Sequence, residues 1–373
     1  MKVLYIVSTL KRTGPTNQLL NIVTNLPLEM TPRVLTLSPE PEDSLWQSFE
    51  EAQIDVNSLN LSRIQGLFQN KSVLSDAVNR FQPEVIHTQG IRADGLVASL
   101  KTSAKKVATL RNFPQLDYPM TYGSFLGRVM CQYHVRQLRH FDRVAGVSDA
   151  VSANLADHFS VRQVSTVRNG VNTERFFPVD LSEKQALREE LGLSSEVTLW
   201  VCTGHLSPRK NPLELIDAWK QVFANDSSQQ LLFLGDGPDM DNCRLATADM
   251  SNVQLIGRTP RVADYLKAAD LYVSPSTAEG MPNAVLEAMA CGLPVLLSNI
   301  DPHNEIISLN SEVGMAYKMG SSSNLADVLQ QFAIMDRSHM VKAVKCAIEK
   351  YLSASAMSAQ YQALYKELLG GAL

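Results

Sequence analysis

Two glutamates, Glu279 and Glu287, stand eight residues apart in a segment that follows a short apolar run at 271–274. Pro282 lies between them and suits the first turn of a helix, because its φ is fixed near the helical value and its missing N–H needs no acceptor there. A helix N-terminus attracts anions such as phosphate, whereas carboxylates accept hydrogen bonds from hydroxyl groups. The pattern therefore favours a ligand with phosphates between two polyols, such as a nucleotide sugar. In the alternative interpretation, Glu279 caps the helix and Glu287 is an ordinary solvated residue.

A second loop, 204–212, places two adjacent cations, Arg209 and Lys210, at the start of the next predicted helix. Cations in this position are opposed by the helix dipole unless an anion binds beside them. We therefore expect both side chains to contact a diphosphate. A solvated basic turn is the alternative.

A third loop follows the first predicted strand and contains one glycine, Gly14, which would let the backbone approach a ligand closely. The G-x-G-x-x-G pattern of dinucleotide-binding enzymes is absent there. His87 is expected at the end of a strand at 85–88, where it is either a satisfied structural residue or a contact for a substrate. No cluster of His, Cys, Asp or Glu has metal-ligand spacing, so we expect no required metal or cofactor.

Short β-rich apolar runs alternate with helical patterns along the whole chain, which indicates βαβ units and parallel sheets. The first half predicts six strands, at 3–8, 34–38, 85–88, 106–110, 143–147 and 164–167. It also predicts helices at 16–26, 71–81, 92–100, 122–141 and 149–159, the last capped by Ser148. The second half predicts six more strands, at 197–203, 230–234, 253–256, 271–274, 295–298 and 313–317.

We therefore expect an α/β fold of two doubly wound, Rossmann-like domains whose parallel sheets face each other across a cleft. The turn and stop residues at 169–178 mark the linker, so the domains are predicted to span 1–170 and 171–355. Residues 356–373 are expected to form a helix that packs back on the first domain.

Composition narrows the class of protein. The chain has 373 residues, 45% of them hydrophobic, and a net charge of -4, which argues against global disorder and against nucleic-acid binding. Five cysteines without a CxxC pair fit a reducing cytoplasm. No apolar stretch is long enough to span a bilayer, so any membrane association would be peripheral.

One segment has a strong local charge, because residues 101–143 carry eight Lys or Arg and two Asp. Arg128, Arg136, Arg139 and Arg143 recur at spacings that place them roughly on one helical face. Such a face could dock on the anionic lipid of a membrane or on an anionic acceptor. A solvated face is the alternative.

With these residues in view, the chain resembles the family 4 glycosyltransferases, retaining enzymes of the GT-B fold. Residues 279–295 match the E-x7-E signature of that family together with its trailing helix and strand. Residues 168–176 resemble its interdomain linker, and 144–148 resemble the close of its first domain. The resemblance covers nearly the whole chain.

The resemblance implies a role for each matching residue. Glu279 would contact hydroxyls of the transferred sugar, Glu287 the ribose, and Lys210 the diphosphate, helped by Arg209. The remaining donor contacts would come from Gly14, His205, Gly257, Arg258, Gly280, Met281, Pro282, Asn283 and Ala284, and the acceptor or sugar side would include His87 and Arg111. Three positions depart from the family pattern: His205 replaces an arginine, Arg111 a histidine, and Gly14 stands alone where two glycines are common.

The implied activity is metal-independent transfer of a sugar from a nucleotide-diphosphate sugar to a glycan or lipid-linked acceptor. The setting would be cell-surface polysaccharide synthesis at the inner face of the cell membrane, with the acceptor on the first domain and the donor on the second. Lys210 and Arg209 would stabilise the leaving diphosphate in a front-side displacement. Glu279 as a nucleophile is the alternative mechanism, and a sugar-nucleotide epimerase or a non-catalytic nucleotide-sugar-binding subunit are the alternative functions.

Overall fold

The computed structural model describes residues 1–61 and 70–371. Its first sheet has seven strands in the order β3-β2-β1-β4-β5-β6-β7, and every neighbouring pair is parallel. The bounds are β1 (Lys2–Val7), β2 (Thr31–Thr36), β3 (Asp55–Ser58), β4 (Val85–Gln89), β5 (Lys105–Leu110), β6 (Arg143–Gly146) and β7 (Val164–Thr166). The order reverses between β1 and β4, which is where an open parallel sheet leaves room for a ligand.

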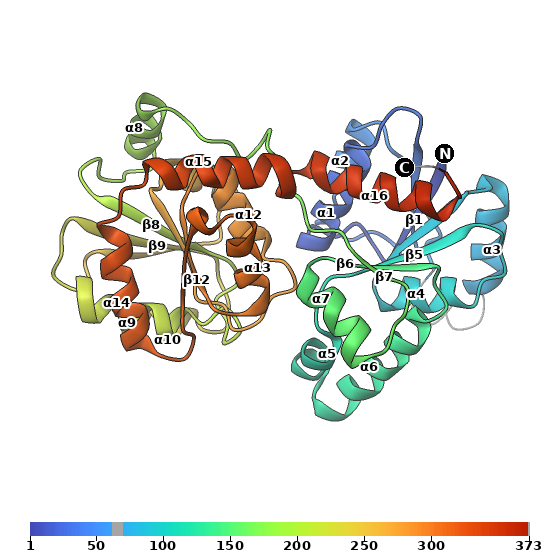
Figure 1. The fold of residues 1–373 in the computed structure, drawn as a ribbon, viewed down its shortest axis with the longest axis horizontal. Coiled ribbons are helices and arrows are strands. Elements are labelled where there is room, and N and C mark those ends of the chain that lie inside the picture. The colour runs from blue at the N-terminus through green and yellow to red at the C-terminus, as the bar shows by residue number, and fades with distance from the viewer. Residues whose placement is uncertain (62–69, 372–373) are drawn as a thin grey trace. The chain divides into compact units, whose positions relative to one another are not determined.

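Helices cover both faces of this sheet. They are α1 (Gly14–Thr24), α2 (Trp46–Glu51), α3 (Asn70–Phe81), α4 (Ile91–Ala98), α5 (Pro114–Tyr122), α6 (Ser124–Leu138), α7 (Asp149–Ala153) with the π-helical turn Asn154–His158, and α16 (Ala354–Leu368). Figure 1 shows α1 and α16 on one side of the sheet, with α4 and α6 on the other. Val3, Tyr5 and Val7 of β1 pack against the side of α1 and α16, as the two-residue period of a strand requires.

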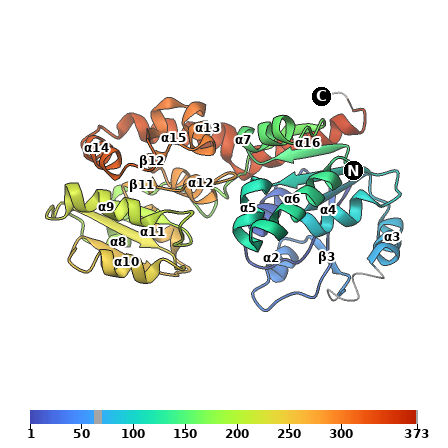
Figure 2. The ribbon, with the colours of Figure 1, turned by 90° about the horizontal axis from the view of Figure 1, so that it is seen from below.

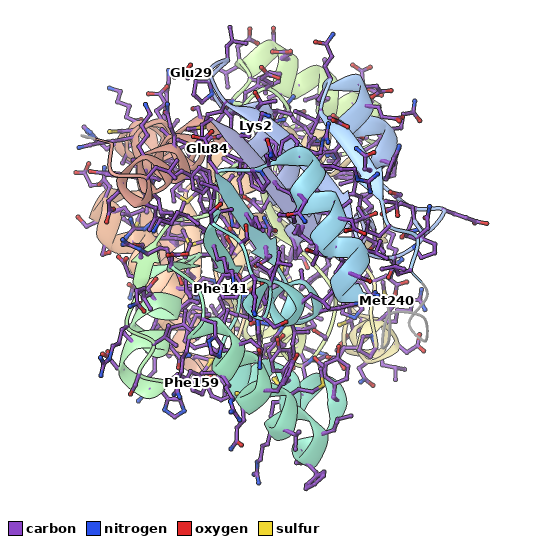
Figure 3. All side chains as sticks on the ribbon, turned by 90° about the vertical axis from the view of Figure 1, so that its right-hand side faces the viewer. Lys2, Glu29, Glu84, Phe141, Phe159 and Met240 are labelled. Atoms are coloured by element: carbon purple, nitrogen blue, oxygen red, sulfur yellow. The ribbon has the colours of Figure 1, made fainter. Side chains whose placement is uncertain are left out.

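The start of β1 is fixed by the loops before β2 and β4. The Lys2 amide donates to Glu84 Oε2 at 2.8 Å, and the Glu84 amide donates to the Lys2 carbonyl at 3.0 Å (Figure 3). The Thr31 amide donates to the Met1 carbonyl at 2.8 Å. These bonds set the register of the central strand.

The second sheet has six strands, all parallel, in the order β10-β9-β8-β11-β12-β13. Their bounds are β8 (Thr198–Thr203), β9 (Gln229–Leu234), β10 (Val253–Gly257), β11 (Leu271–Ser274), β12 (Val295–Ser298) and β13 (Gly314–Tyr317). The core on one face is centred on Trp200, whose ring lies 5.8 Å from that of Trp219 between centroids. Here the order reverses between β8 and β11, and the loops after these two strands are the ones that the sequence analysis singled out.

Helices also cover both faces of the second sheet. They are α8 (Leu181–Glu190), α9 (Pro212–Phe223), α10 (Met240–Ala246), α11 (Val262–Ala268), α12 (Asn283–Ala290), α13 (Asp301–Leu309), α14 (Ser322–Ala333) and α15 (Ser338–Ala347), with a 3-10 turn at Ser311–Val313 and a π-helical turn at Ile348–Leu352. Figure 1 shows α12 and α15 on one side of this sheet, with α9, α10 and α14 on the other. The prediction of two doubly wound α/β domains is confirmed.

The chain divides into two compact units. Unit 1 comprises Met1–Gly170 and Ala354–Leu373, and unit 2 comprises Val171–Ser353. The two ends of unit 2 lie side by side, because Val171 forms a parallel bridge with Ser353 and its amide donates to the Leu352 carbonyl at 2.8 Å. The last helix, α16, packs along α1 within unit 1, where the Ser358 hydroxyl donates to the Ile22 carbonyl at 2.7 Å.

All twelve predicted strands are present, and Ser148 caps α7 by accepting from the Val151 amide at 3.1 Å. The sequence analysis did not predict β3, α2 or α5. Strand β3 is short, polar and at the edge of its sheet, so it lacks the apolar run that marks a buried strand. The predicted helix at 122–141 was wrong at its start, because Gly123 with φ of 80° separates α5 from α6.

Candidate functional site

The loops after β8 and β11 are bonded to each other at the carboxyl edge of the second sheet. The amide of Thr277 donates to the Arg209 carbonyl at 2.8 Å, and the Thr277 hydroxyl contacts the same oxygen at 3.1 Å. Segments 204–212 and 275–282, far apart in the sequence, therefore form one surface. This surface holds most of the predicted donor-binding residues.

Glycines allow the neighbouring loops to pack closely around it. The Gly204 amide donates to the Leu234 carbonyl at 2.9 Å, and a Cβ built on Gly235 would lie 1.8 Å from the Gly204 oxygen. Gly204 and Gly235 have φ of 139° and 145°, conformations that other residues rarely adopt. Side chains at these positions would push the loop of β9 away from the loop of β8.

Lys210 and Glu279 form an ion pair in this surface, with 2.6 Å between Lys210 Nζ and Glu279 Oε1. The Lys210 side chain is 17% exposed and the Glu279 side chain 8%. Gly204 makes room for the lysine, because a Cβ built there would lie 3.2 Å from Lys210 Cε. The structure thus brings together the two residues that the sequence analysis assigned to the diphosphate and the sugar.

The Glu279 carboxylate is held in its charged form. Burial alone raises its pKa, but Lys210, then Arg209 and His303, outweigh burial, and the pKa falls below its usual value. Glu279 is therefore an acceptor of hydrogen bonds at neutral pH and has no proton to donate.

The pKa of Glu287, on the helix that follows, is shifted in the opposite direction. Burial raises its pKa from 4.5 to about 7, a rise that Arg175 and Lys210 only partly offset. The side chain is half-buried on α12, where it can meet solvent or a ligand. Two carboxylates eight residues apart thus sit in environments of different charge.

Helix α12 begins one residue later than expected. Pro282 is its N-cap with extended backbone, φ of -79° and ψ of 95°, and its carbonyl accepts from the Val285 amide at 3.0 Å. Asn283 is the first helical residue, and no side chain caps the helix. Gly280, Met281 and Pro282 are buried, whereas Asn283 and Ala284 are partly exposed at the positive end of the helix dipole.

Three more predicted donor contacts, His205, Gly257 and Arg258, lie on the same edge of the sheet. His205 is exposed in the loop after β8, and Arg258 is exposed directly after β10. Gly257 ends β10 with φ of 78°, and its carbonyl accepts from the Gly235 amide at 2.9 Å. These residues rim the surface at the ends of β8 and β10.

His303 is a member of this site that the sequence analysis missed. It is fully buried on α13, with Nδ1 2.9 Å from Ser298 Oγ and 3.1 Å from the Ser298 carbonyl oxygen. The Ser298 hydroxyl in turn donates to the Ser276 carbonyl at 2.5 Å, in the loop that carries Glu279. Burial lowers the pKa of His303 to about 4, so the ring is neutral and positions that loop.

Two further contributors, Glu214 and Arg175, also escaped the sequence analysis. Glu214 Oε1 accepts from the amides of Gly320 and Ser321 at 2.8 and 2.9 Å, which ties α9 to the loop after β13. Arg175 is the largest influence opposing the raised pKa of Glu287. Both act across long sequence separations, so no local spacing could have revealed them.

Of the two interpretations of His87, the structure supports the structural one and not the contact for a substrate. Strand β4 continues to Gln89, so His87 lies in the middle of the strand and not at its end, and its side chain is fully buried. Its Nδ1 lies 2.6 Å from the Tyr365 hydroxyl of α16, and its Nε2 lies 2.7 Å from Thr109 Oγ1. Burial lowers the pKa of His87 to about 3, so it is a neutral residue of the core.

Gly14 and Arg111 belong to unit 1 as well. Gly14 is the first residue of α1 and is partly exposed. Arg111 follows β5 and donates to Asn169 Oδ1 at 2.7 Å and to Gln89 Oε1 at 3.0 Å. It is half-buried, and burial lowers the pKa of its guanidinium. Arg111 thus joins the ends of β4 and β5 to the last residues before unit 2.

Two family models match the chain. The model described as "Glycosyltransferase Family 4" matches residues 18–175, and the model described as "Glycosyl transferases group 1" matches residues 198–333. The first falls mainly on unit 1, and the second lies within unit 2.

Named relatives are also glycosyltransferases. A UDP-Gal:alpha-D-GlcNAc-diphosphoundecaprenol alpha-1,3-galactosyltransferase of Escherichia coli is 35% identical over 155 residues, which is 39% of either chain. The chain thus covers well under two thirds of that relative. An O-antigen biosynthesis glycosyltransferase of Escherichia coli, WclY, is 24% identical over 379 residues, with 99% of each chain covered.

Among solved structures, the fold resembles that of Anabaena HepE in complex with UDP, with a TM-score of 0.81. The identity is 18%, and the match covers 98% of this chain and all of that one. The two parallel sheets, the two matched family models and this likeness of fold all indicate the same family. The chain belongs to the family 4 glycosyltransferases and has the GT-B fold.

Proposed function

We propose that this glycosyltransferase moves a sugar from a nucleotide-diphosphate sugar to a glycan or lipid-linked acceptor, with retention of configuration at the anomeric carbon. The observation that carries the proposal is the Lys210–Glu279 pair, set in the joined loops of β8 and β11 beside the start of α12. A charge pair so little exposed contributes weakly to stability, because desolvation offsets its attraction. Its placement is therefore better explained by a polar, anionic ligand.

The relatives support the same class of substrates. The galactosyltransferase of Escherichia coli is named for a UDP-sugar donor and a diphosphoundecaprenol acceptor, and WclY for O-antigen biosynthesis. The HepE structure holds UDP. A nucleotide-sugar donor bound by unit 2 and an acceptor used in cell-surface polysaccharide assembly fit these names.

The proposed reaction breaks the bond between the anomeric carbon and the diphosphate oxygen, and the diphosphate leaves with the electron pair. Lys210, with Arg209 beside it, stabilises the negative charge that develops on that oxygen, and the positive end of the α12 dipole adds to this field. The acceptor hydroxyl forms the new bond on the same face and gives its proton to the departing phosphate. Glu279, ionised, accepts hydrogen bonds from hydroxyls of the sugar and orients it.

Glu287, with a pKa near neutrality, would accept a hydrogen bond from a ribose hydroxyl when ionised. The exposed Arg258 and the backbone of Gly257 would flank the base. The residues of this chain supply the positive charge that the leaving group needs, so we expect activity without a divalent metal.

The test begins with thermal-shift screening of a panel of nucleotide sugars, followed by mass spectrometry of products formed with glycan and lipid-diphosphate acceptors. The expected result is a glycosylated product whose linkage has the anomeric configuration of the donor, as read by NMR. Consumption of the nucleotide sugar with no glycosylated product would identify an epimerase instead. Binding without any turnover would identify a non-catalytic binding subunit.

A further inference from the structure

Arg111 carries a positive charge that no carboxylate of the described chain balances. It directly follows β5 and is half-buried. Its hydrogen bonds go to two neutral groups, the Gln89 amide oxygen at 3.0 Å and the Asn169 amide oxygen at 2.7 Å. Among residues 1–61 and 70–371 it forms no ion pair. Because burying a charge without a counter-ion is costly, this arginine points to an anion that comes from outside the chain.

The acids nearest to Arg111 in the sequence do not supply the missing charge. Residues 90–104 and 111–141, which follow β4 and β5, contain two acids, Asp94 and Asp117. Asp94 Oδ2 lies 2.7 Å from His134 Nε2, and Asp117 accepts from the Asn112 side-chain amide at 2.5 Å. The two acids lie on α4 and α5, helices that both pack beside α6 (Figure 2). Neither segment therefore provides a counter-ion for Arg111.

Other arginines with little exposure do have a carboxylate partner. Arg188 in unit 2 is buried and pairs with Asp270 at 2.6 Å. In unit 1, Arg143 pairs with Glu367 at 2.6 Å. Arg143 lies in β6 and not on the helical face that the sequence analysis gave it, so that part of the prediction was wrong. Arg111 differs from both because its bonds leave the charge unbalanced.

The free donors of Arg111 and Gln89 suit an anion. A guanidinium has five N–H groups, and the bonds to the Gln89 and Asn169 oxygens leave one N–H on each of Nη1 and Nη2 without a partner in the described chain. Two such donors match two oxygens of a carboxylate or a phosphate. Because Arg111 can only donate, the Gln89 oxygen must face it. Gln89 Nε2 is then left buried without a partner in 1–61 and 70–371, on a side chain that is 9% exposed.

We propose that Arg111, with the Gln89 amide as a second donor, binds an anionic group of the acceptor, a phosphate or a carboxylate, at the carboxyl edge of the first sheet. The strand order of this sheet reverses between β1 and β4, the strand that Gln89 ends. An open parallel sheet receives its ligand at such a reversal. The proposal rests on the proposed function, in which unit 1 takes the acceptor, and adds the charge of that acceptor.

Two classes of acceptor carry such a group, a lipid-linked diphosphate and a glycan that ends in an acidic sugar. The water-soluble probes are a short-chain alkyl diphosphate of N-acetylglucosamine and methyl glucuronide, each paired with a neutral methyl glycoside, of N-acetylglucosamine and of glucose. Within 1–61 and 70–371, no helix is long and apolar enough to cross a bilayer, and the titrations are made in aqueous buffer. In calorimetric titration of the full chain, one anionic probe is expected to bind at least about tenfold more tightly than its neutral partner. The probe that does so identifies the group.

Two substitutions separate a bound anion from a purely structural contact. Arg111→Gln removes the charge, so the preference for the anionic probe is expected to fall about 10- to 100-fold. Gln89→Glu supplies the missing carboxylate within the protein, so it is expected to raise the melting temperature and yet to remove the same preference. A purely structural arginine would gain stability from Gln89→Glu without any change in binding.

The matched control is Arg128→Gln, which removes the same charge from an exposed arginine of α6 and should leave binding and melting temperature unchanged. Equal affinity for each anionic probe and its neutral partner would overturn the proposal. So would a lack of binding by both anionic probes, or wild-type anion binding in Arg111→Gln and Gln89→Glu.

Steady-state kinetics keep this proposal apart from the proposed function. Arg111→Gln should raise KM for the charged acceptor and leave kcat nearly unchanged. An unchanged KM would contradict the anion site alone. A chain that binds an anionic probe through Arg111 but transfers no sugar would contradict the proposed function alone.

Discussion

One buried polar cluster in each unit shows how differently such groups can be satisfied. In unit 1, His87, Thr109 and three tyrosines form a neutral network that closes on itself: Tyr5 and Tyr365 hydroxyls lie 3.1 Å apart, and those of Thr109 and Tyr361 lie 2.7 Å apart. In unit 2, the pair of Lys210 and Glu279 is charged, and it lies beside exposed residues.

The difference favours a structural role for the first cluster and the proposed ligand-binding role for the second. A closed neutral network has each partner bonded and nothing left to bind a ligand, so it fixes α16 to the sheet. A buried ion pair pays a desolvation cost that hydrophobic residues would avoid. The Lys210–Glu279 pair at the carboxyl edge of the sheet is therefore consistent with the proposed ligand, whereas the bonds of His87 are those of a structural residue.

The sharpest test of this comparison is Lys210→Ala. Loss of the cation at the leaving diphosphate is expected to lower kcat about 100- to 1000-fold. The control is Lys220→Ala, which removes an exposed lysine paired with Asp249 in the same unit. Steady-state rates of both variants measure the effect. Near-normal turnover in Lys210→Ala would show that the lysine does not contribute to catalysis.

Tyr365→Phe probes the neutral network. It removes the hydroxyl that meets both His87 and Tyr5, and leaving these buried groups short of a partner is expected to cost about 1–3 kcal/mol. Urea denaturation, followed by far-UV circular dichroism, measures the loss in the free energy of unfolding. Turnover per folded molecule should stay at the wild-type level, and a fall in kcat without a fall in stability would return His87 to the acceptor side.

The substitution Glu287→Gln is expected to affect stability and donor binding with opposite dependences on pH. The pKa of Glu287 in the folded chain, about 7, lies above its ordinary 4.5. The folded state therefore binds this proton more tightly, so the stability contributed by the group is present below pH 4.5 and is lost as the pH rises through 7. The variant should melt at a higher temperature than the wild type at pH 8, with a smaller difference at pH 5.

Donor binding should respond in the opposite sense in the same variant. The ionised carboxylate is the stronger acceptor, so wild-type affinity for the nucleotide sugar should fall as the pH drops through 7. In Glu287→Gln the affinity should be about tenfold lower at pH 8 and nearly independent of pH. Calorimetric titration at several pH values checks this, and an unchanged pH profile would mean that another group controls it.

The smallest expected effect is that of a chelator. In the proposed mechanism Lys210 and Arg209 provide the positive charge beside the leaving group, so EDTA is expected to leave turnover unchanged. Assays before and after dialysis against EDTA, with magnesium added back as the control, measure this. A metal-dependent rate would show that the two cations are not sufficient.

The fold and much of the donor surface follow from local sequence. Buried parallel strands produce apolar runs that are easy to find, and glycine and proline mark their ends, as around Pro282 and Gly292. The same reasoning found Lys210 and Glu279, because each lies in a loop directly after such a strand. The expected cleft between the two halves, and the roles of the individual site residues, stay predictions.

What sequence could not supply are contacts between elements. His303 reaches the loop of Glu279 through Ser298, and Glu214 holds a loop more than a hundred residues away. The two interpretations of His87 could not be separated for a related reason: the strand continues to Gln89, so the side chain faces α16 and not the end of the sheet. Such facts depend on exact strand bounds and on which face each residue occupies.

The return of α16 to unit 1 also governs the order in which the molecule can be completed during synthesis. The core under the first sheet includes Met357, Tyr361 and Tyr365, which leave the ribosome after the whole of unit 2. In newly made unit 1, α1 therefore covers only part of one face of the sheet, and the rest of that face stays exposed while the middle of the chain is translated. Release of the final helix closes that face, so premature termination just before Ala354 would yield a chain prone to aggregation even though unit 2 is intact.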